Sequence, residues 1–458
     1  MIRGRPEEIM STLNRRKFIK GAAVGAASMP LFSIGKPGPS ANGKINVAVV
    51  GAGGMGGYAF RRAASEENLA AICDVDFKRA WRALKKHPDV PHFKDFRVML
   101  DKMGDQIDAV AISTPDHTHF PAAMAAIERG KHVFVQKPLA HNIWQCRTLQ
   151  KAAKEHKVIT QMGNQGHTMD GMRRIKEWVD AGIVGDVTEV ITWTDRPIPP
   201  WFIPPKSFPP ATAEVPKDLD WDLWHGPVEP KPFSPDYAPV LWRGWWDYGC
   251  GALGDIGCHT FDAPFWVLDL GMPTKVEVER RDPPGPGYIS PGSVVTYHFP
   301  ARGSKPPVTL KWFEKGYDVP KPKGWEKDKP LPAEGGMYME GSKETLFHAG
   351  MRPASPQIIP TNRFTELRSE LVKIPRLPGV GPGPIEEWFR AIKGGPTPGS
   401  HFDYSAPLTE MVLLGAMAQR SGKTIEWDAE NMKVKGQPEF DAWIKEPARK
   451  GREYGEKG

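Results

Sequence analysis

Residues 45–56 read Ile-Asn-Val-Ala-Val-Val-Gly-Ala-Gly-Gly-Met-Gly, and this stretch decides the fold. Its first half is a short apolar run rich in β-branched residues, which predicts a buried strand. Its second half is a G-x-G-x-x-G pattern, and residues 58–67 after it have helix-forming character. A strand, this glycine pattern and a helix in direct succession are typical of a site that binds the pyrophosphate of a dinucleotide.

The glycine loop has a physical role at each position in that interpretation. The first glycine allows a tight turn, the second lets the backbone approach the pyrophosphate, and the third lets the helix pack on the strand. The free N–H groups at the start of the helix attract the phosphates. We therefore expect the cofactor to contact Gly51, Gly53, Gly54, Met55 and Gly56. A glycine turn that binds no nucleotide is the alternative.

Asp74 bears on the choice of cofactor. It ends the second predicted strand, where a carboxylate can accept hydrogen bonds from both ribose hydroxyls, and this favours NAD. Lys78 and Arg79 follow closely and are able to bind a 2′-phosphate, so NADP stays open.

The rest of the chain divides into two parts that differ in their pattern of predicted strands and helices. Residues 44–163 alternate predicted strands (69–73, 107–113, 132–135, 158–162) with predicted helices (77–86, 121–129, 143–156), which indicates a parallel sheet covered on both faces. Residues 164–458 begin with a helix at 170–181 and continue with strands at 187–193, 275–279, 293–299 and 308–313, expected in a mostly antiparallel sheet. Two later helices are predicted at 385–392 and 408–420.

Composition excludes several classes of protein. With 458 residues, 40% of them hydrophobic and 25% charged, the chain is typical of a globular protein of two or three domains. A net charge of +7, spread thinly, gives little support to nucleic-acid binding. The four cysteines form no CxxC pair, and a group of Cys250, Cys258 and His259 lacks a recognisable zinc spacing. We therefore expect no metal site.

The N-terminal 43 residues are predicted to be an export signal and linker. Arg15 and Arg16, with Phe18 at the expected offset, precede an uncharged run from Gly21 to Gly35 that is short for a membrane span. The paired arginines resemble a twin-arginine signal, so the protein is expected in the periplasm or otherwise outside the cytoplasm, with the export machinery as a partner. Such signals are associated with folded cargo, so a cofactor would be bound before export. A disordered basic tail and an uncleaved anchor are the alternatives.

An insertion rich in proline and tryptophan spans residues 196–248. Thirteen prolines fall between Arg196 and Val240, which rules out long regular elements. Long irregular insertions in enzymes are commonly binding loops. Because indole rings pack on the C–H faces of sugars, Trp193 and Trp245 are candidate substrate residues, although about half of the tryptophans here should be ordinary core residues.

Polar residues gather where predicted parallel strands end, which is where such sheets bind ligands. Thr114, Pro115 and His119 follow the third strand, Gln136 and Lys137 follow the fourth, and Asn164 and His167 follow the fifth. We expect the first group and Gln136 at the cofactor, and Asn164 and His167 at the substrate. The alternative for His119, equally well supported, is that it packs inside the fold. The alternative for Asn164 and His167 is that they form hydrogen bonds within their own loop.

Asp255 and His259 stand four residues apart far downstream. If their segment is helical, a carboxylate and an imidazole share one face, which is a proton-transfer arrangement. A helix cap and a core histidine form the alternative interpretation of this pair.

Taken in order, the glycine loop, Thr114-Pro115-Asp116-x-x-His119, Lys137-Pro138 and Asp255-x-x-x-His259 resemble the glucose-fructose oxidoreductase and inositol dehydrogenase family, Gfo/Idh/MocA. The resemblance spans residues 44–428. It implies an α/β protein with an N-terminal Rossmann domain and a C-terminal α/β domain that carries a large, mostly antiparallel open sheet and often forms homo-oligomers. It also implies nicotinamide-dependent oxidation or reduction at a secondary carbinol of a sugar or polyol. Gln136 departs from the family's glutamate before the Lys-Pro pair.

The resemblance places Lys137, Asp255 and His259 at the chemical step. We expect His259 as the base, Lys137 as the cation that stabilises the developing alkoxide, and Asp255 as the residue that orients His259; the first two roles are interchangeable. Because free NAD is scarce outside the cytoplasm, the cofactor should be tightly bound. A redox-neutral, NAD-dependent glycoside hydrolase is the alternative function, and a non-catalytic sugar-binding protein the second.

Overall fold

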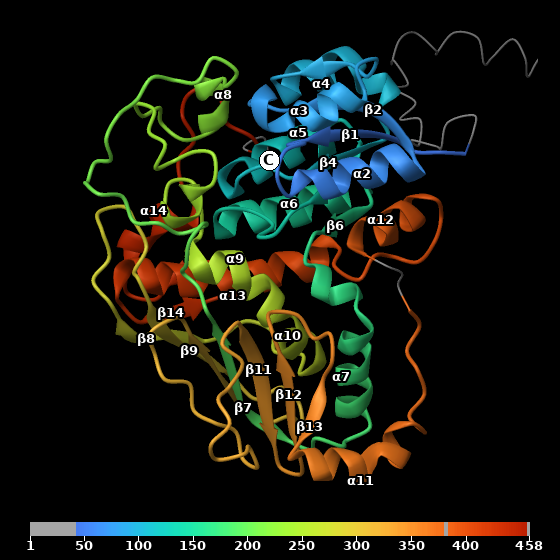
Figure 1. The fold of residues 1–458 in the computed structure, drawn as a ribbon, viewed down its shortest axis with the longest axis vertical. Helices are drawn as coiled ribbons and strands as arrows, with labels where there is room; N and C mark the ends of the chain where they lie inside the picture. Colours follow the sequence, from blue (N-terminus) through green and yellow to red (C-terminus); the bar gives the residue numbers. More distant parts are fainter. Residues whose placement is uncertain (1–42, 380–382, 456–458) are drawn as a thin grey trace, which may run out of the picture. The chain divides into compact units, whose positions relative to one another are not determined.

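The computed structural model describes residues 43–379 and 383–455 (Figure 1), and the predicted export signal lies outside these ranges. Within them, no helix combines the length and apolar character that crossing a membrane requires. Two sheets dominate the described chain, one of six strands and one of nine.

The six-stranded sheet confirms the predicted Rossmann fold. Its strands run parallel in the order β3-β2-β1-β4-β5-β6, so the chain crosses over from β3 at one edge to β4 beside β1. The strands are short, and β1, β4, β5 and β6 are almost wholly buried, as expected where helices cover both faces. Their bounds are β1 Asn46–Val50, β2 Asn68–Cys73, β3 His92–Phe93, β4 Ala109–Ile112, β5 His132–Val135 and β6 Thr160–Met162.

Helices cover this sheet on both sides. They are α2 (Gly56–Glu66), α3 (Phe77–Lys86), α4 (Phe96–Met103), α5 (His119–Ile127) and α6 (Ile143–Glu155). Side chains that accept a backbone N–H cap three of them at the start, namely Asp76, Asp95 and Asn142. A helix from late in the chain, α12 (Pro384–Ile392), packs with α2 and α3 in the same apolar cluster.

The nine-stranded sheet has the order β13-β12-β11-β7-β10-β9-β8-β14-β15. β10 pairs with β7 in parallel and the other neighbours pair antiparallel, which confirms the mostly antiparallel prediction. The bounds are β7 Val187–Thr194, β8 Lys275–Arg281, β9 Ser293–Phe299, β10 Val308–Phe313, β11 Gly335–Gly341, β12 Thr345–Ala349, β13 Gln357–Ile359, β14 Ile425–Asp428 and β15 Lys433–Val434.

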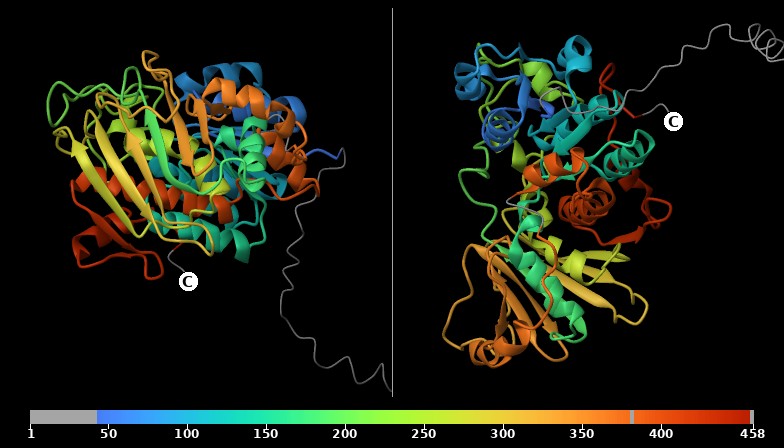
Figure 2. Two further views of the ribbon diagram at one scale, coloured as in Figure 1. Left: turned by 90° about the horizontal axis from the view of Figure 1, so that it is seen from below. Right: turned by 90° about the vertical axis from the view of Figure 1, so that its right-hand side faces the viewer.

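Helix α13 (Phe402–Ser421) joins the two halves of the described chain. It contacts α6 of the Rossmann domain on one side and β8 and β9 of the large sheet on another (Figures 1 and 2). It begins six residues before the predicted start, so that Pro407 lies inside the helix. The other helices are α7 (Asp170–Asp180), α9 (Gly251–Thr260), α10 (Asp262–Val267), α11 (Thr361–Leu371) and α14 (Asp441–Ile444).

The insertion at 196–248 is mostly irregular, as predicted, with one short helix, α8 (Trp221–His225), and one 3-10 turn, η4 (Leu241–Gly244). Its aromatic residues form a cluster of their own with Tyr288. A β-bridge between Asp76 and Leu219 ties the insertion to the Rossmann domain, just beyond the end of β2. The insertion therefore lies at the carboxyl edge of the six-stranded sheet.

Candidate active site

A pocket of about 350 Å³ opens at the carboxyl edge of the six-stranded sheet. One wall comes from the glycine loop and the ends of β2, β4 and β5, and the other from the insertion. The lining includes these residues predicted from the sequence: Gly51, Gly53, Gly54, Met55, Asp74, Thr114, Pro115, Gln136, Lys137 and Asp255. Segments more than two hundred residues apart, from Gly51 to Asp255, therefore meet where the parallel strands end.

The glycine loop has the geometry that its pattern predicts. Gly51 has φ +82°, and a Cβ there would lie 2.7 Å from the carbonyl oxygen of Ser113. A Cβ on Gly56 would lie 1.7 Å from the carbonyl oxygen of Gly51, so the start of α2 packs directly on the turn. Both positions therefore require glycine, and the loop presents backbone at the N-terminal end of α2, which fits a pyrophosphate.

Asp74 lines the same pocket. Its carboxylate accepts hydrogen bonds from the backbone N–H groups of Ala52 (2.9 Å) and Gly53 (3.2 Å), so it is held beside the glycine loop. These hydrogen bonds lower the pKa of Asp74, but burial outweighs them, so the pKa is raised above its ordinary value. Arg79 also lines this pocket, so the residues present fit an adenosine ribose with either a 2′-hydroxyl or a 2′-phosphate.

Unpaired polar atoms mark the middle of the pocket. Ser113 Oγ, Thr114 Oγ1 and Gln136 Nε2 are buried, and none has a hydrogen-bond partner among the described residues. All three residues line the pocket. Buried polar atoms are normally paired, so this set is suited to a polar ligand such as a dinucleotide.

His119, a predicted cofactor residue with packing as the alternative, is not among the residues that line the pocket. One ring nitrogen lies 2.8 Å from the carbonyl oxygen of Pro138 and the other 2.9 Å from that of Thr114. The buried ring thus ties the loop after β4 to the loop after β5. His119 is a positioning residue for the two segments that carry Thr114 and Lys137.

Lys137 is held by Asp255 at the inner end of the pocket. Its ammonium donates to Asp255 Oδ1 at 2.5 Å and to the Asp255 carbonyl oxygen at 2.7 Å. Arg243, which sequence reasoning missed, places its Nε 3.4 Å from the same Oδ1 and stacks on Trp242. Burial would raise the pKa of Asp255, but the charges of Lys137 and Arg243 outweigh it and hold this pKa below its ordinary value.

His259 lies close enough for the charges of Lys137 and Asp255 to act on it, so the structure brings the three predicted residues together. Its side chain is buried, and Nδ1 has no hydrogen-bond partner among the described residues. The carboxylate of Asp255 bonds to Lys137 and acts on His259 through its charge, so the predicted orienting role of Asp255 stays a prediction. Burial, with the positive charge of Lys137, holds the pKa of His259 well below its usual value, so the ring is neutral at neutral pH.

Asn164 and His167 meet on a buried carboxylate whose role the sequence did not reveal, that of Asp262. Asn164 Nδ2 donates to Asp262 Oδ2 at 2.9 Å, and His167 Nδ1 lies 2.9 Å from Oδ1. The Tyr404 hydroxyl donates to Oδ1 at 2.6 Å. His167 is 2% exposed and stays inside this network, whereas the Oδ1 atom of Asn164 is left without a partner among the described residues.

Trp193 and Trp245, the predicted substrate residues, are not among the residues that line the pocket. Trp193 lies in β7, packs on Tyr338 and Phe347, and donates its indole N–H to Pro332. Trp245 donates to Asp236 inside the aromatic cluster of the insertion. Three other tryptophans of the insertion line the pocket, namely Trp201, Trp224 and Trp242.

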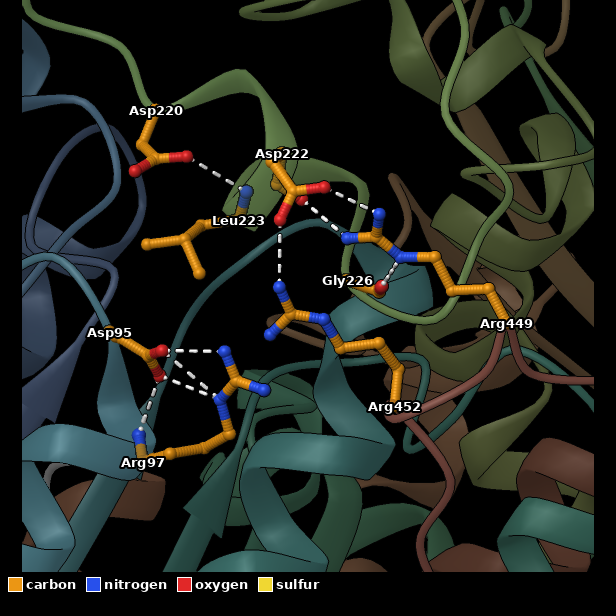
Figure 3. Close-up of polar contacts among 8 residues, drawn as sticks. All are labelled: Asp95, Arg97, Asp220, Asp222, Leu223, Gly226, Arg449 and Arg452. Atoms are coloured by element: carbon orange, nitrogen blue, oxygen red, sulfur yellow. Dashed lines mark hydrogen bonds and ion pairs between the residues drawn. The ribbon is translucent and has the colours of Figure 1, made fainter.

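The C-terminal segment fastens the insertion in place (Figure 3). Arg449 donates to the Asp222 carboxylate at 2.5 Å, to the Asp222 carbonyl oxygen at 2.7 Å and to that of Gly226 at 2.8 Å. Arg452 donates to the second oxygen of the Asp222 carboxylate at 2.8 Å. Asp222 lies in α8, next to the pocket-lining residues Leu223 and Trp224. We call residues 446–455 the strap, because they tie the pocket's outer wall down.

Comparison with known proteins agrees with this geometry. Residues 45–164 match the model of an oxidoreductase family with an NAD-binding Rossmann fold, and residues 172–287 match that family's C-terminal alpha/beta domain. The inositol 2-dehydrogenase of Salmonella typhimurium is 30% identical over 146 residues, 31% of this chain and 43% of that protein. The levoglucosan dehydrogenase of Pseudarthrobacter phenanthrenivorans is 24% identical over 234 residues, 49% of this chain and 51% of that protein.

These curated relatives are matched over about half of their length or less. Among solved structures, the WlbA dehydrogenase from Bordetella pertussis, in complex with NADH and UDP-GlcNAcA, superposes with a TM-score of 0.56 at 18% identity, covering 84% of this chain and 99% of that one. This likeness concerns the fold. Because the two family models together span more than half of the sequence, the chain belongs to the Gfo/Idh/MocA oxidoreductase family.

Proposed function

We propose that the protein is an NAD-dependent oxidoreductase that transfers hydride at a secondary hydroxyl of a sugar, polyol or glycoside. The observation that carries the proposal is the pocket that joins the glycine loop to Lys137 and Asp255, with His259 beside them. A bound nicotinamide would supply the hydride acceptor. The printed names of two matched relatives, inositol 2-dehydrogenase and levoglucosan dehydrogenase, support a sugar or polyol as the substrate.

The chain's own residues divide the remaining chemistry between them. Oxidation breaks the carbinol C–H bond, whose electron pair leaves with the hydride, and the hydroxyl proton must go to a base as the C=O bond forms. His259 suits the base, because its neutral ring has an unpaired nitrogen. Lys137 uses two N–H bonds on Asp255, which leaves a third to stabilise the negative charge on the substrate oxygen.

We also propose that the cofactor is tightly bound. The insertion forms one wall of the pocket, and the strap holds that wall through Asp222. A cofactor enclosed in this way would leave only when the wall opens. Retention fits a cycle in which the cofactor is regenerated in place, either by a second substrate or within a redox-neutral glycoside cleavage.

Export remains a proposal from the sequence, resting on Arg15, Arg16 and Phe18. Replacing both arginines by lysine should keep the protein in the cytoplasm, which cell fractionation measures. Unchanged export would contradict a twin-arginine signal.

Absorbance of the purified protein tests the proposed function. After extensive dialysis, the spectrum should still show bound nicotinamide, and adding a substrate sugar should change the absorbance near 340 nm. Release of the leaving group from an aryl glycoside without net reduction would instead indicate the redox-neutral hydrolase. Gly51→Ala is the matched control: its Cβ would meet Ser113, so this variant should lose the bound nucleotide. A protein that binds sugar but shows no nicotinamide would refute the proposal.

A further inference from the structure

Three buried polar atoms beyond Lys137 have no hydrogen-bond partner among the described residues. They are Asn164 Oδ1, His259 Nδ1 and Arg352 Nε. Asn164 and His259 are 0% and 3% exposed. Arg352 lies against the loop that follows Asn164, because its Nη2 donates to Gln165 at 3.0 Å, and its charge acts on His259. The carbonyl oxygen of the Asn164 side chain, a ring nitrogen of the predicted base and the guanidinium of Arg352 thus each have an unsatisfied polar atom.

The charge of Arg352 is not balanced by the protein. Its hydrogen-bond partner Gln165 is neutral, and burial lowers the pKa of its guanidinium with no carboxylate of the described chain opposing the shift. Arg173, which is buried, differs because Glu387, Asp262 and Asp170 act on it. A partly buried cation without a counter-charge is costly, so its position calls for a reason other than stability.

The carboxylate that pairs with Lys137 and Arg243 does not also pair with Arg352. Both lie on Asp255, and the buried carboxylate of Asp116 also acts on these two cations. Neither carboxylate acts on Arg352. Neutral hydroxyls would not compensate the charge of Arg352, whereas an anionic substituent would.

The loop after β12 holds Arg352 rigidly. A Cβ on Gly171 would lie 1.5 Å from the carbonyl oxygen of Pro353, and one on Gly166 would lie 3.4 Å from the Pro353 ring. Such close backbone packing fixes the residue next to Arg352 against the start of α7. The backbone beside Arg352 is thus held in place and its guanidinium is bonded to Gln165, which lowers the entropic cost of binding a ligand group.

We infer that Arg352 binds a carboxylate of the substrate, so that the enzyme acts on a sugar acid such as a uronate rather than on a neutral sugar. This inference rests on the proposed function and names its substrate class. A guanidinium matches the two oxygens of a carboxylate, and its unpaired Nε leaves an N–H for one of them. Asn164 Oδ1 and His259 Nδ1 then face hydroxyls of the same sugar. A single uncompensated cation suits a monoanion better than a phosphate dianion.

The test compares matched pairs of substrates on the protein with its bound cofactor, such as methyl glucoside with methyl glucuronide and galactose with galacturonate. The readout is kcat/KM from nicotinamide absorbance. Hydrogen bonds to charged groups predict a preference for the acid of roughly tenfold to a hundredfold. In Arg352→Gln this ratio should collapse towards one, and in Arg352→Lys it should be retained in part. Arg363→Gln, at an exposed ion pair in α11, is the control and should keep the wild-type ratio.

The outcomes separate the two proposals. Reduction of the bound nicotinamide by neutral sugars and acids at equal rates would overturn the carboxylate inference and leave the oxidoreductase standing. Reduction by no sugar of either kind would overturn the proposed function itself. A preference for a sugar phosphate over both would overturn the assignment of a carboxylate. The wild-type comparison decides the inference even if an Arg352 variant fails to fold.

Discussion

Replacing Lys137 by alanine separates the catalytic role of this residue from its structural one. The ammonium lies 2.5 Å from Asp255 Oδ1, and both side chains are 15% exposed. Removing one partner of a buried ion pair costs about 3–5 kcal/mol, because the other charge is left unpaired. Arg243 remains 3.4 Å from the same oxygen. With this second cation and some access of water, we expect a loss in the free energy of unfolding of about 2 kcal/mol.

Turnover should fall much further than stability. Loss of a donor aimed at a developing oxyanion typically costs about 3–4 kcal/mol, so kcat should drop by about a hundredfold to a thousandfold. The bound dinucleotide should remain, because the Lys137 ammonium contacts Asp255 and not the glycine loop.

Three measurements on one preparation check this prediction: urea unfolding, nicotinamide content after dialysis, and sugar-dependent absorbance change. The double variant Lys137→Ala/Asp255→Asn removes the stranded charge, so it should regain stability and stay inactive. If Lys137→Ala lost its cofactor, or if the double variant regained turnover, the assignment of Lys137 to the substrate oxygen would be refuted.

Three further predictions address the ends of the site and the core. Arg449→Ala removes three side-chain hydrogen bonds of the strap. Because the Asp222 side chain is 59% exposed, we expect the cofactor to be released only about tenfold faster in a competition assay. An unchanged rate would show that the strap does not retain the cofactor. Burial raises the pKa of Glu314 from 4.5 to about 7, so the folded state prefers the neutral acid and loses stability as pH rises through that window. Glu314→Gln should therefore stabilise the protein by about 3 kcal/mol at pH 8 and hardly at pH 5 in urea unfolding, and equal effects at both pH values would exclude a buried proton there. Asp74→Ala should weaken the binding of NAD by about tenfold to a hundredfold in titration calorimetry. The binding of NADP should weaken less, because Arg79 lies next to its 2′-phosphate. Equal losses of affinity would argue against contact between Asp74 and the ribose.

The sequence predicted the parts of the molecule that local patterns determine. Apolar strand runs and the glycine loop carry their own signals, so the parallel sheet and the position of the pocket followed directly. β3 has only two residues and was missed. α4 was also missed, although Phe96, Met99, Leu100 and Met103 stand at helical spacing.

Residues that meet through tertiary contacts were harder to predict. The spacing of Asp255 and His259 indicated a shared helix face, but the partner of the carboxylate came from a distant loop, as Lys137. Arg243 and Arg352 carry no motif, and only the folded chain brings them to the site. Tryptophan content indicated an aromatic insertion without showing which rings, such as Trp193, belong to a core. The tertiary contacts of each tryptophan decide that question.

A structure determined with NAD bound tests the central claim most directly. We predict adenosine at Asp74, the pyrophosphate on the loop from Gly51, and the nicotinamide ring next to Lys137 and His259, with room for a carbinol carbon within about 3.5 Å of the ring. A dinucleotide bound in the opposite direction, or a nicotinamide ring remote from Lys137 and His259, would contradict the account.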